Sequence, residues 1–217
     1  MKRNKPPPAR RRSLENVGLV TIVGLGAVGR QTALLLAAMG LPRLQLVDSR
    51  VVTRALHAAE GYPFEDVGRP RVHAAAQQCH QLNPRLDISA LFTRTLRGID
   101  PGDAVLGCPG RPRSWVALLQ RSQRTLVAAR CDVVGSTVRL DLARDAASLA
   151  ERLARASSSS LARRSSRKAI PIPVATIAAG WLVAEFLRFL VGDEQRRSVR
   201  LALDAIRWDT RIRRRRP

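Results

Sequence analysis

Val20-Thr-Ile-Val-Gly-Leu-Gly-Ala-Val-Gly29 is the stretch of sequence that determines the fold. It places a G-x-G-x-x-G loop directly after an apolar run, residues 17–23, that is typical of a short buried strand. Residues 30–39 follow with the helical spacing of alanine and leucine. In such a loop the first glycine makes a tight turn, the second lets a phosphate approach the backbone, and the third lets the helix pack closely on the strand. Because the N–H groups that open the helix then face an anion, the loop predicts a nucleotide site.

Asp48 lies at the position where such a site needs a carboxylate. Residues 44–48, Leu-Gln-Leu-Val-Asp, predict the second strand, and Asp48 ends it 19 residues after Gly29. A carboxylate at this place accepts hydrogen bonds from ribose hydroxyls and repels a 2′-phosphate, which argues against NADP. The spacing leaves both NAD and ATP open as the nucleotide. Glycines that serve only a tight crossover are the alternative interpretation of the same loop.

The rest of the chain alternates between strand and helix patterns. We expect a helix over residues 67–82, which Asn83-Pro84 ends, and another over residues 114–123. Further strands are expected at residues 88–92, 104–108, 126–129 and 138–142. An apolar helix over residues 171–190 precedes a terminal strand or hairpin at residues 199–212. This alternation predicts an α/β fold, a doubly wound, mainly parallel (Rossmann-like) sheet with helices on both faces.

These patterns predict one domain with two tails. Residues 17–212 form the expected nucleotide-binding domain, which carries a mobile serine- and arginine-rich loop at residues 152–168. Residues 1–16 and 213–217 are expected to be basic tails. The net charge of +21 resides mostly in three runs without an acidic residue, at 1–12, 152–168 and 211–216. Such runs attract polyanions without sequence preference, so we expect only nonspecific polyanion contact from the tails.

Composition excludes several classes of protein. A hydrophobic fraction of 45% over 217 residues allows a sizeable core and excludes wholesale disorder. Three cysteines and three histidines exclude a disulfide framework and a zinc ribbon, and no protein metal site is predicted. Residues 169–184 carry no charge but are fewer than the ~20 residues of a spanning helix. We therefore expect a cytoplasmic protein without a membrane segment.

Three further segments resemble a known family. They are Gly40-Leu-Pro-Arg-Leu-Gln-Leu-Val-Asp48, Asp66-Val-Gly-Arg-Pro-Arg-Val-His-Ala-Ala-Ala and Leu82-Asn-Pro84. With the glycine loop they resemble the ThiF/MoeB/HesA superfamily of adenylating enzymes, and the resemblance covers most of residues 17–212. It implies ATP and magnesium as cofactors. It also implies transfer of AMP to the C-terminal carboxylate of a ubiquitin-like or sulfur-carrier protein, by a homo- or heterodimer.

The resemblance assigns roles to particular residues. Gly24, Gly26, Gly29 and Asp48 match the nucleotide-binding positions of the family. Arg71 stands where the family has a phosphate-contacting lysine, and it would hold phosphates with help from Arg30 or Arg54. The expected catalytic residues are therefore Arg71 and Arg54. The expected cofactor-binding residues are Gly24, Gly26, Gly29, Arg30 and Asp48.

The sequence also departs from the family pattern. The arginine of the family's N-L-N-R-Q motif falls at Ala58 or Ala59, with Arg54 and His57 as the nearest basic residues. The magnesium-binding aspartate aligns with Gly110, and the second acid after the ribose aspartate is replaced by Arg50. No cysteine follows Cys131, so thioester transfer is not expected.

These departures leave three hypotheses for the function. The first is a minimal ATP-dependent adenylating enzyme that acts on a carrier protein. The second is a catalytically deficient pseudoenzyme, which serves as partner or scaffold for an active paralogue or a carrier. The third is an NAD-dependent oxidoreductase, and it ranks last because the sequence offers no Tyr-x-x-x-Lys pair.

Overall fold

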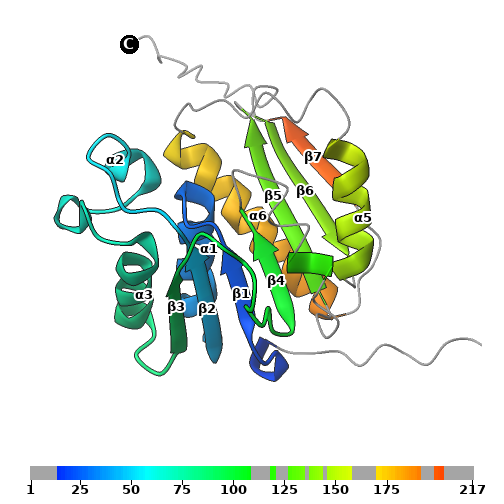
Figure 1. Cartoon of the computed structure of the whole chain (residues 1–217), viewed down its shortest axis with the longest axis horizontal. Coiled ribbons are helices and arrows are strands. Elements are labelled where there is room, and N and C mark those ends of the chain that lie inside the picture. The colour runs from blue at the N-terminus through cyan, green and yellow to red at the C-terminus, as the bar shows by residue number, and fades with distance from the viewer. Residues whose placement is uncertain are drawn as a thin grey trace, which may run out of the picture.

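A seven-stranded sheet with strand order β3-β2-β1-β4-β5-β6-β7 forms the centre of the molecule (Figure 1). The computed structural model describes residues 14–108, 118–120, 127–134, 137–143, 146–157, 170–191 and 198–202. The strands are β1 (Val20–Val23), β2 (Arg43–Asp48), β3 (Asp87–Phe92), β4 (Ala104–Gly107), β5 (Val127–Val134), β6 (Thr137–Ala143) and β7 (Ser198–Ala202). β3, β2, β1, β4 and β5 pair in parallel, and β6 is antiparallel to both β5 and β7. The predicted doubly wound, mainly parallel sheet is confirmed.

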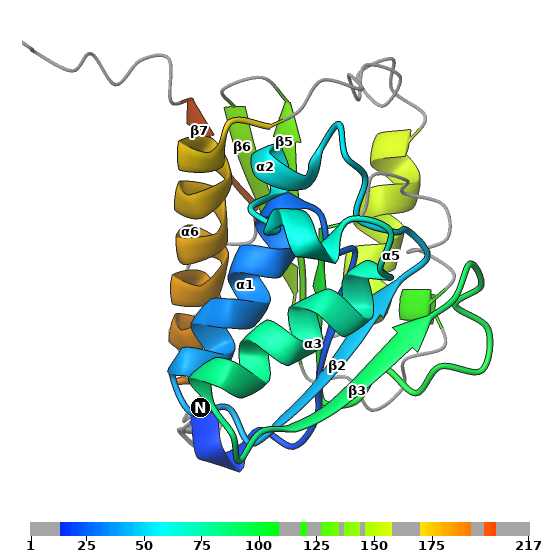
Figure 2. The same cartoon turned by 90° about the vertical axis from the view of Figure 1, so that its left-hand side faces the viewer.

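Helices cover both faces of this sheet (Figure 2). One layer holds α1 (Ala27–Ala38), α3 (Arg71–Leu82) and α6 (Ile172–Leu190), in which α1 packs between the other two. The opposite face carries α5 (Ala146–Ser157), which contacts β5 and β6. The short elements are α2 (His57–Glu60) and two 3-10 turns, η1 (Leu14–Asn16) and η2 (Phe64–Asp66). The arrangement is that of an α/β Rossmann-like fold.

The central strands are apolar on both sides because both faces of the sheet are covered. On β1, Val20 and Ile22 belong to the larger core cluster, which the layer of α1, α3 and α6 completes. Val23 of the same strand belongs to a second cluster on the α5 side. Every residue of β1 and β4 is buried, which explains why these stretches show no polar alternation.

Several element boundaries differ from the sequence-based expectation. α1 begins at Ala27, inside the glycine motif, rather than at residue 30. α3 begins at Arg71 rather than at residue 67, because Pro70 stands before it in an extended conformation and pairs with Val51 in a short bridge. β5 runs to Val134, beyond the expected end at residue 129.

The prediction of a loop at residues 152–168 is wrong for the first part of that range. α5, which the sequence analysis does not predict, extends to Ser157, so residues 152–157 are helical. Ala146, Leu149 and Ala150 supply its buried face at helical spacing. Residues 158–168, both tails outside residues 14–202 and most of the helix expected at 114–123 lie outside the described residues.

α6 is the one helix in the described ranges whose length and composition would allow it to cross a membrane. Ala178, Leu182 and Phe186, spaced four residues apart along the helix, are fully buried. They belong to the same core cluster as residues of α1 and β5. A core helix meets the same criteria of length and composition, and this side of α6 packs into the core, whereas Ile172 and Ile177 of the same helix are exposed.

Gly29 gives the first testable prediction. A Cβ on Gly29 would lie 1.8 Å from the carbonyl oxygen of Gly24, a backbone atom that cannot move aside like a side chain. Replacement by alanine should therefore lower the free energy of unfolding by about 3 kcal/mol, as measured by urea denaturation. Gly180 is the control, because it lies inside α6 with open space around it. Gly180→Ala should stabilise by about 0.5–1 kcal/mol, and equal effects of the two changes would contradict the packing described here.

Candidate nucleotide site

The strand order reverses between β1 and β4, which pair side by side in the sheet. The chain proceeds from β1 through β2 to β3 on one side, and then returns to β4 on the other side of β1. In open α/β sheets, ligands bind where the strand order reverses in this way. The glycine loop follows β1 at this edge, and Cys108 follows β4. Gly110, which replaces the family's magnesium-binding aspartate, lies outside the described residues.

The glycine loop has the conformation that its sequence predicts. Gly24 has φ +89°, which favours glycine, and its N–H donates to the carbonyl of Val47 at 2.8 Å. Gly26 is the N-cap of α1, and no side chain caps the helix there. In the described part of the chain, the N–H groups at the start of α1 therefore remain available as donors to an anion.

Asp48 is tied directly to this loop. Its Oδ2 accepts a hydrogen bond of 2.6 Å from the N–H of Leu25, inside the glycine motif. Its Oδ1 accepts a second bond of 2.8 Å from the N–H of Arg50. The side chain is only 8% exposed. The carboxylate of β2 and the loop after β1 are thus held as one unit, with lone pairs left on both oxygens.

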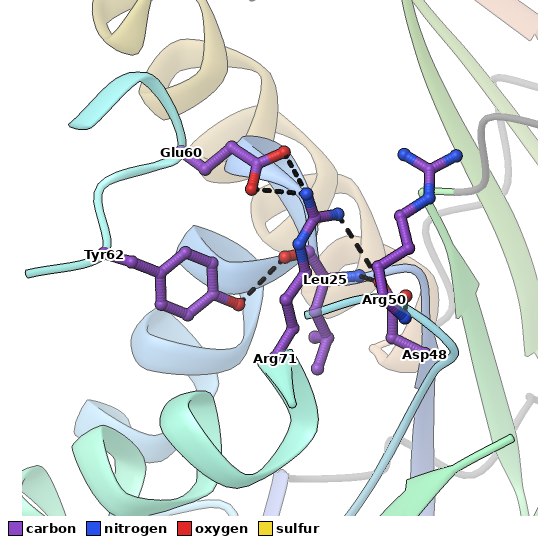
Figure 3. A network of polar contacts seen from close by, with 6 residues as sticks. All are labelled: Leu25, Asp48, Arg50, Glu60, Tyr62 and Arg71. Carbon is purple, nitrogen blue, oxygen red and sulfur yellow. Dashed lines mark hydrogen bonds and ion pairs between the residues drawn. The ribbon is translucent and has the colours of Figure 1, made fainter. Parts of the chain in front are cut away.

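Arg71 links Asp48 to a second carboxylate (Figure 3). Its Nη2 lies 2.6 Å from both carboxylate oxygens of Glu60, and its Nη1 lies 4.0 Å from Oδ2 of Asp48. The Arg71 side chain is 2% exposed and that of Glu60 is 12% exposed. A buried guanidinium needs such partners, because an uncompensated charge in the interior costs several kcal/mol. The Nε–H of Arg71 is buried with no acceptor within the described residues.

Tyr62 closes the network behind the loop. It is 2% exposed, and its hydroxyl donates to the carbonyl of Leu25 at 2.9 Å. Burial raises the pKa of Tyr62, which keeps the hydroxyl protonated and able to donate. The Arg30 guanidinium lies over its ring at 5.2 Å, and Arg30 Nε also donates to Gln78 at 2.8 Å. Asp48 therefore holds the N–H of Leu25 by a hydrogen bond, and Tyr62 holds the carbonyl of the same residue.

Two opposing effects act on the carboxyl of Glu60. Burial raises its pKa above the usual value, and the adjacent Arg71 guanidinium acts in the opposite direction. Asp48 adds a smaller raising contribution, and Arg50 a smaller lowering one. The raised pKa shows that desolvation of Glu60 outweighs its attraction to Arg71.

The structure brings most of the predicted site residues together. Gly24, Gly26, Gly29, Asp48 and Arg71 meet at the carboxyl edge of the sheet. Arg30 lies against the same loop but is engaged with Tyr62 and Gln78. Arg54, in contrast, lies over the ring of Phe64 at 5.8 Å, on an exposed part of the chain.

Glu60 and Tyr62 belong to the network of the candidate site, and sequence reasoning misses them. Glu60 ends the four-residue helix α2, and Tyr62 follows the left-handed Gly61. In sequence, the available signal is a single acid in the segment where the family's N-L-N-R-Q motif is expected. Nothing in that signal pairs it with Arg71, eleven positions later.

The described residues include no cluster of metal-ligating side chains, and two of the three cysteines are buried. No group of three or more His, Cys, Asp and Glu side chains there could hold a metal ion. Cys79 is fully buried, and burial raises the pKa of its thiol to about 12, so it is not a reactive thiolate. Cys131 is buried as well.

The comparison with protein families agrees with this geometry. The family model described as the ThiF family matches residues 7–217. This chain belongs to the ThiF family. The expected membership of the ThiF/MoeB/HesA superfamily is thereby confirmed.

One curated relative and several solved structures are similar to this ThiF-family chain. It is 38% identical over 87 residues to the sulfur carrier protein ThiS adenylyltransferase of Escherichia coli (strain K12), covering 40% of this chain and 34% of that enzyme. It superposes on E. coli MccB, crystallised with ATP, with a TM-score of 0.65 at 16% identity, covering 83% of this chain and 57% of MccB. PaaA gives a TM-score of 0.65 at 16% identity, covering 86% and 69%. The structural likeness shows the fold, and the chain spans about a third of the ThiS enzyme.

Proposed function

We propose that this ThiF-family chain binds ATP at its glycine loop and transfers AMP to the C-terminal carboxylate of a small carrier polypeptide. The observation that carries the proposal is the bond from Leu25 N–H to Asp48, which joins phosphate loop and ribose carboxylate into one site. The family supports ATP as the nucleotide, since ThiF-type adenylyltransferases use it. The fold shared with MccB, crystallised with ATP, is consistent with this choice.

The residues of the site have distinct roles in this proposal. Asp48 accepts hydrogen bonds from the ribose hydroxyls with its free lone pairs. The N–H groups at the start of α1 donate hydrogen bonds to phosphate oxygens. A carboxylate oxygen of the carrier attacks the α-phosphorus, the bond to the β-phosphate breaks, and pyrophosphate leaves. Arg71 lies 4.0 Å from the Asp48 carboxylate, and its Nε–H, which has no acceptor among the described residues, is suited to an anionic acceptor. Magnesium, when bound with ATP, neutralises part of the charge on the leaving pyrophosphate.

The relatives indicate the kind of partner. One is named for the adenylation of the sulfur carrier protein ThiS, and MccB is crystallised with MccA. We propose a polypeptide partner of the sulfur-carrier or ubiquitin-like kind for this chain, in a soluble, cytoplasmic setting. Dimerisation, as homo- or heterodimer, belongs to the same proposal.

A partner protein without turnover is the second candidate. Two observations favour it. Arg71 is engaged by Glu60 at 2.6 Å, and α2 presents Ala58 and Ala59 where the family motif has an arginine. Removal of one preorganised charge partner costs about 3 kcal/mol of transition-state stabilisation, so the loss of both this arginine and the carboxylate expected at Gly110 would leave slow chemistry.

ATP–pyrophosphate exchange separates the two candidates. The purified chain is incubated with ATP, Mg²⁺, labelled pyrophosphate and candidate carrier proteins. We expect carrier-dependent exchange above background, and its loss in Asp48→Ala, because that change removes the ribose acceptor. ATP binding without exchange would favour the partner role, and binding of NAD but not ATP would instead favour the oxidoreductase hypothesis.

A further inference from the structure

Glu60 lies near Gly26, the second glycine of the loop. A Cβ built on Gly26 would have a single neighbour within 4 Å among the described residues, Oε1 of Glu60 at 3.8 Å. In a G-x-G-x-x-G loop, the side on which the second glycine lacks a Cβ is the side from which a phosphate approaches. A carboxylate oxygen of the chain itself is therefore present on the approach to the loop.

The surroundings of this carboxylate are those that a phosphate would use. The N-terminus of α1, which has a partial positive charge, carries no side-chain cap, and Glu60 approaches its N-cap residue, Gly26. Arg71 approaches both carboxylate oxygens at 2.6 Å. A helix N-terminus on one side and a buried arginine on the other form an anion-binding site that a side chain of this chain approaches from α2.

The backbone around Glu60 supports this placement. Gly61 ends α2 in a left-handed conformation, φ +79°, and a Cβ there would lie 2.7 Å from Nη1 of Arg30. The turn therefore depends on glycine and directs the chain from Glu60 to the buried Tyr62. Glu60 is thus held near the loop by the backbone as well as by Arg71.

We propose that the Glu60 carboxylate is an internal anion at the phosphate position of the glycine loop, and that nucleotide phosphates must displace it to bind. The inference rests on the proposed function, because it names how ATP access to that site is regulated. It assigns Glu60 as a residue that restrains ATP binding. It assigns Arg71 two alternative partners, Glu60 in the free protein and phosphate in the complex.

Displacement of a charged Glu60 also implies that the affinity for ATP depends on pH. The groups facing Glu60 are Arg71 of α3, Asp48 of β2, the neighbouring Arg50, and Tyr62, which stays protonated. A triphosphate repels the ionised carboxylate more than the neutral one. Because burial already raises the pKa of Glu60, acid should release it from the site, and ATP affinity should fall as pH rises through that pKa.

Titrations of the full chain with ATP and, separately, with inorganic tripolyphosphate test this inference. Glu60→Gln removes the charge but keeps an acceptor for Arg71, and it should raise the affinity for both ligands about tenfold at pH 8. Glu65→Gln is the matched control, because it removes the same charge from the exposed neighbouring turn η2, and it should change affinity less than about twofold. Glu60→Asp keeps the charge for Arg71 but shortens the side chain, so it should give a smaller gain than Glu60→Gln while preserving the fold.

Each outcome of these titrations decides a separate question. Equal or weaker binding of both ligands by Glu60→Gln would overturn the inference, whether or not ATP binds the unaltered chain. Tighter tripolyphosphate binding by Glu60→Gln, with no ATP binding by either protein, would support the inference and overturn the proposed function. The pH dependence gives an additional measurement. The affinity ratio of Glu60→Gln to the unaltered chain should shrink in acid, and a constant ratio would contradict charge displacement.

Discussion

Replacing Arg71 by methionine should lower the free energy of unfolding by about 3–5 kcal/mol at neutral pH. Methionine fills a similar volume but leaves Glu60 without the cation at 2.6 Å and removes the positive charge beside Asp48. Both carboxylates are largely buried, so water cannot replace the lost partner well. Urea denaturation of the variant and the unaltered chain, monitored by circular dichroism, measures the difference.

The pH dependence of the stability lost in Arg71→Met shows whether the unpaired Glu60 carboxylate causes that loss. Burial raises the pKa of Glu60, and removal of Arg71 should raise it further. An acid with a raised pKa in the folded state binds protons more readily when folded, so the folded state is favoured in acid and loses stability as pH rises through that pKa. The deficit of Arg71→Met should therefore shrink as pH falls. Arg71→Lys, which keeps the charge, should lose less, and a deficit below about 1 kcal/mol for Arg71→Met would contradict the central role of the network.

Gly26→Glu should weaken ATP binding by about a hundredfold or more while the fold remains intact. The backbone at Gly26 has φ −70°, which any residue adopts, and the space beyond its Cβ is open apart from Glu60. The new carboxylate would occupy the phosphate approach and repel the triphosphate. Isothermal titration calorimetry measures the affinity, and the thermal melting temperature checks the fold.

Ala55→Glu is the control for Gly26→Glu. Ala55 is exposed, in the turn that precedes α2, so its replacement adds the same charge without filling the loop. Its ATP affinity should change less than about twofold. If Gly26→Glu bound ATP as the unaltered chain does, the glycine loop would have no part in nucleotide binding.

The core of the site could be predicted because its residues are determined by local geometry. A G-x-G-x-x-G loop after a strand determines where the helix begins, and parallel pairing of β1 with β2 brings Asp48 to the same edge. Arg71 could be placed there only by its resemblance to the family, since its charge alone does not specify a partner. The parallel strands could also be predicted from the sequence, because strands buried on both faces form continuous apolar runs.

Other features depend on contacts that sequence spacing does not specify. Glu60 reaches the loop from a four-residue helix, which is too short to show a helical period. Tyr62 is the one tyrosine of the chain, and its bond to the carbonyl of Leu25 crosses 37 positions of sequence. α5 combines alanines with arginines and serines, a composition that also suits a solvated loop. In each case tertiary packing, rather than local pattern, decides the structure.

Equilibrium dialysis of the unaltered chain and of Asp48→Ala against labelled ATP, with and without excess NAD, tests the central claim most directly. If the glycine loop and Asp48 form an adenine nucleotide site, the unaltered chain should bind ATP saturably at one molecule per chain. NAD in excess should leave that binding in place, and Asp48→Ala should weaken it about tenfold or more. Binding that Asp48→Ala leaves unchanged, or that NAD displaces completely, would contradict the account.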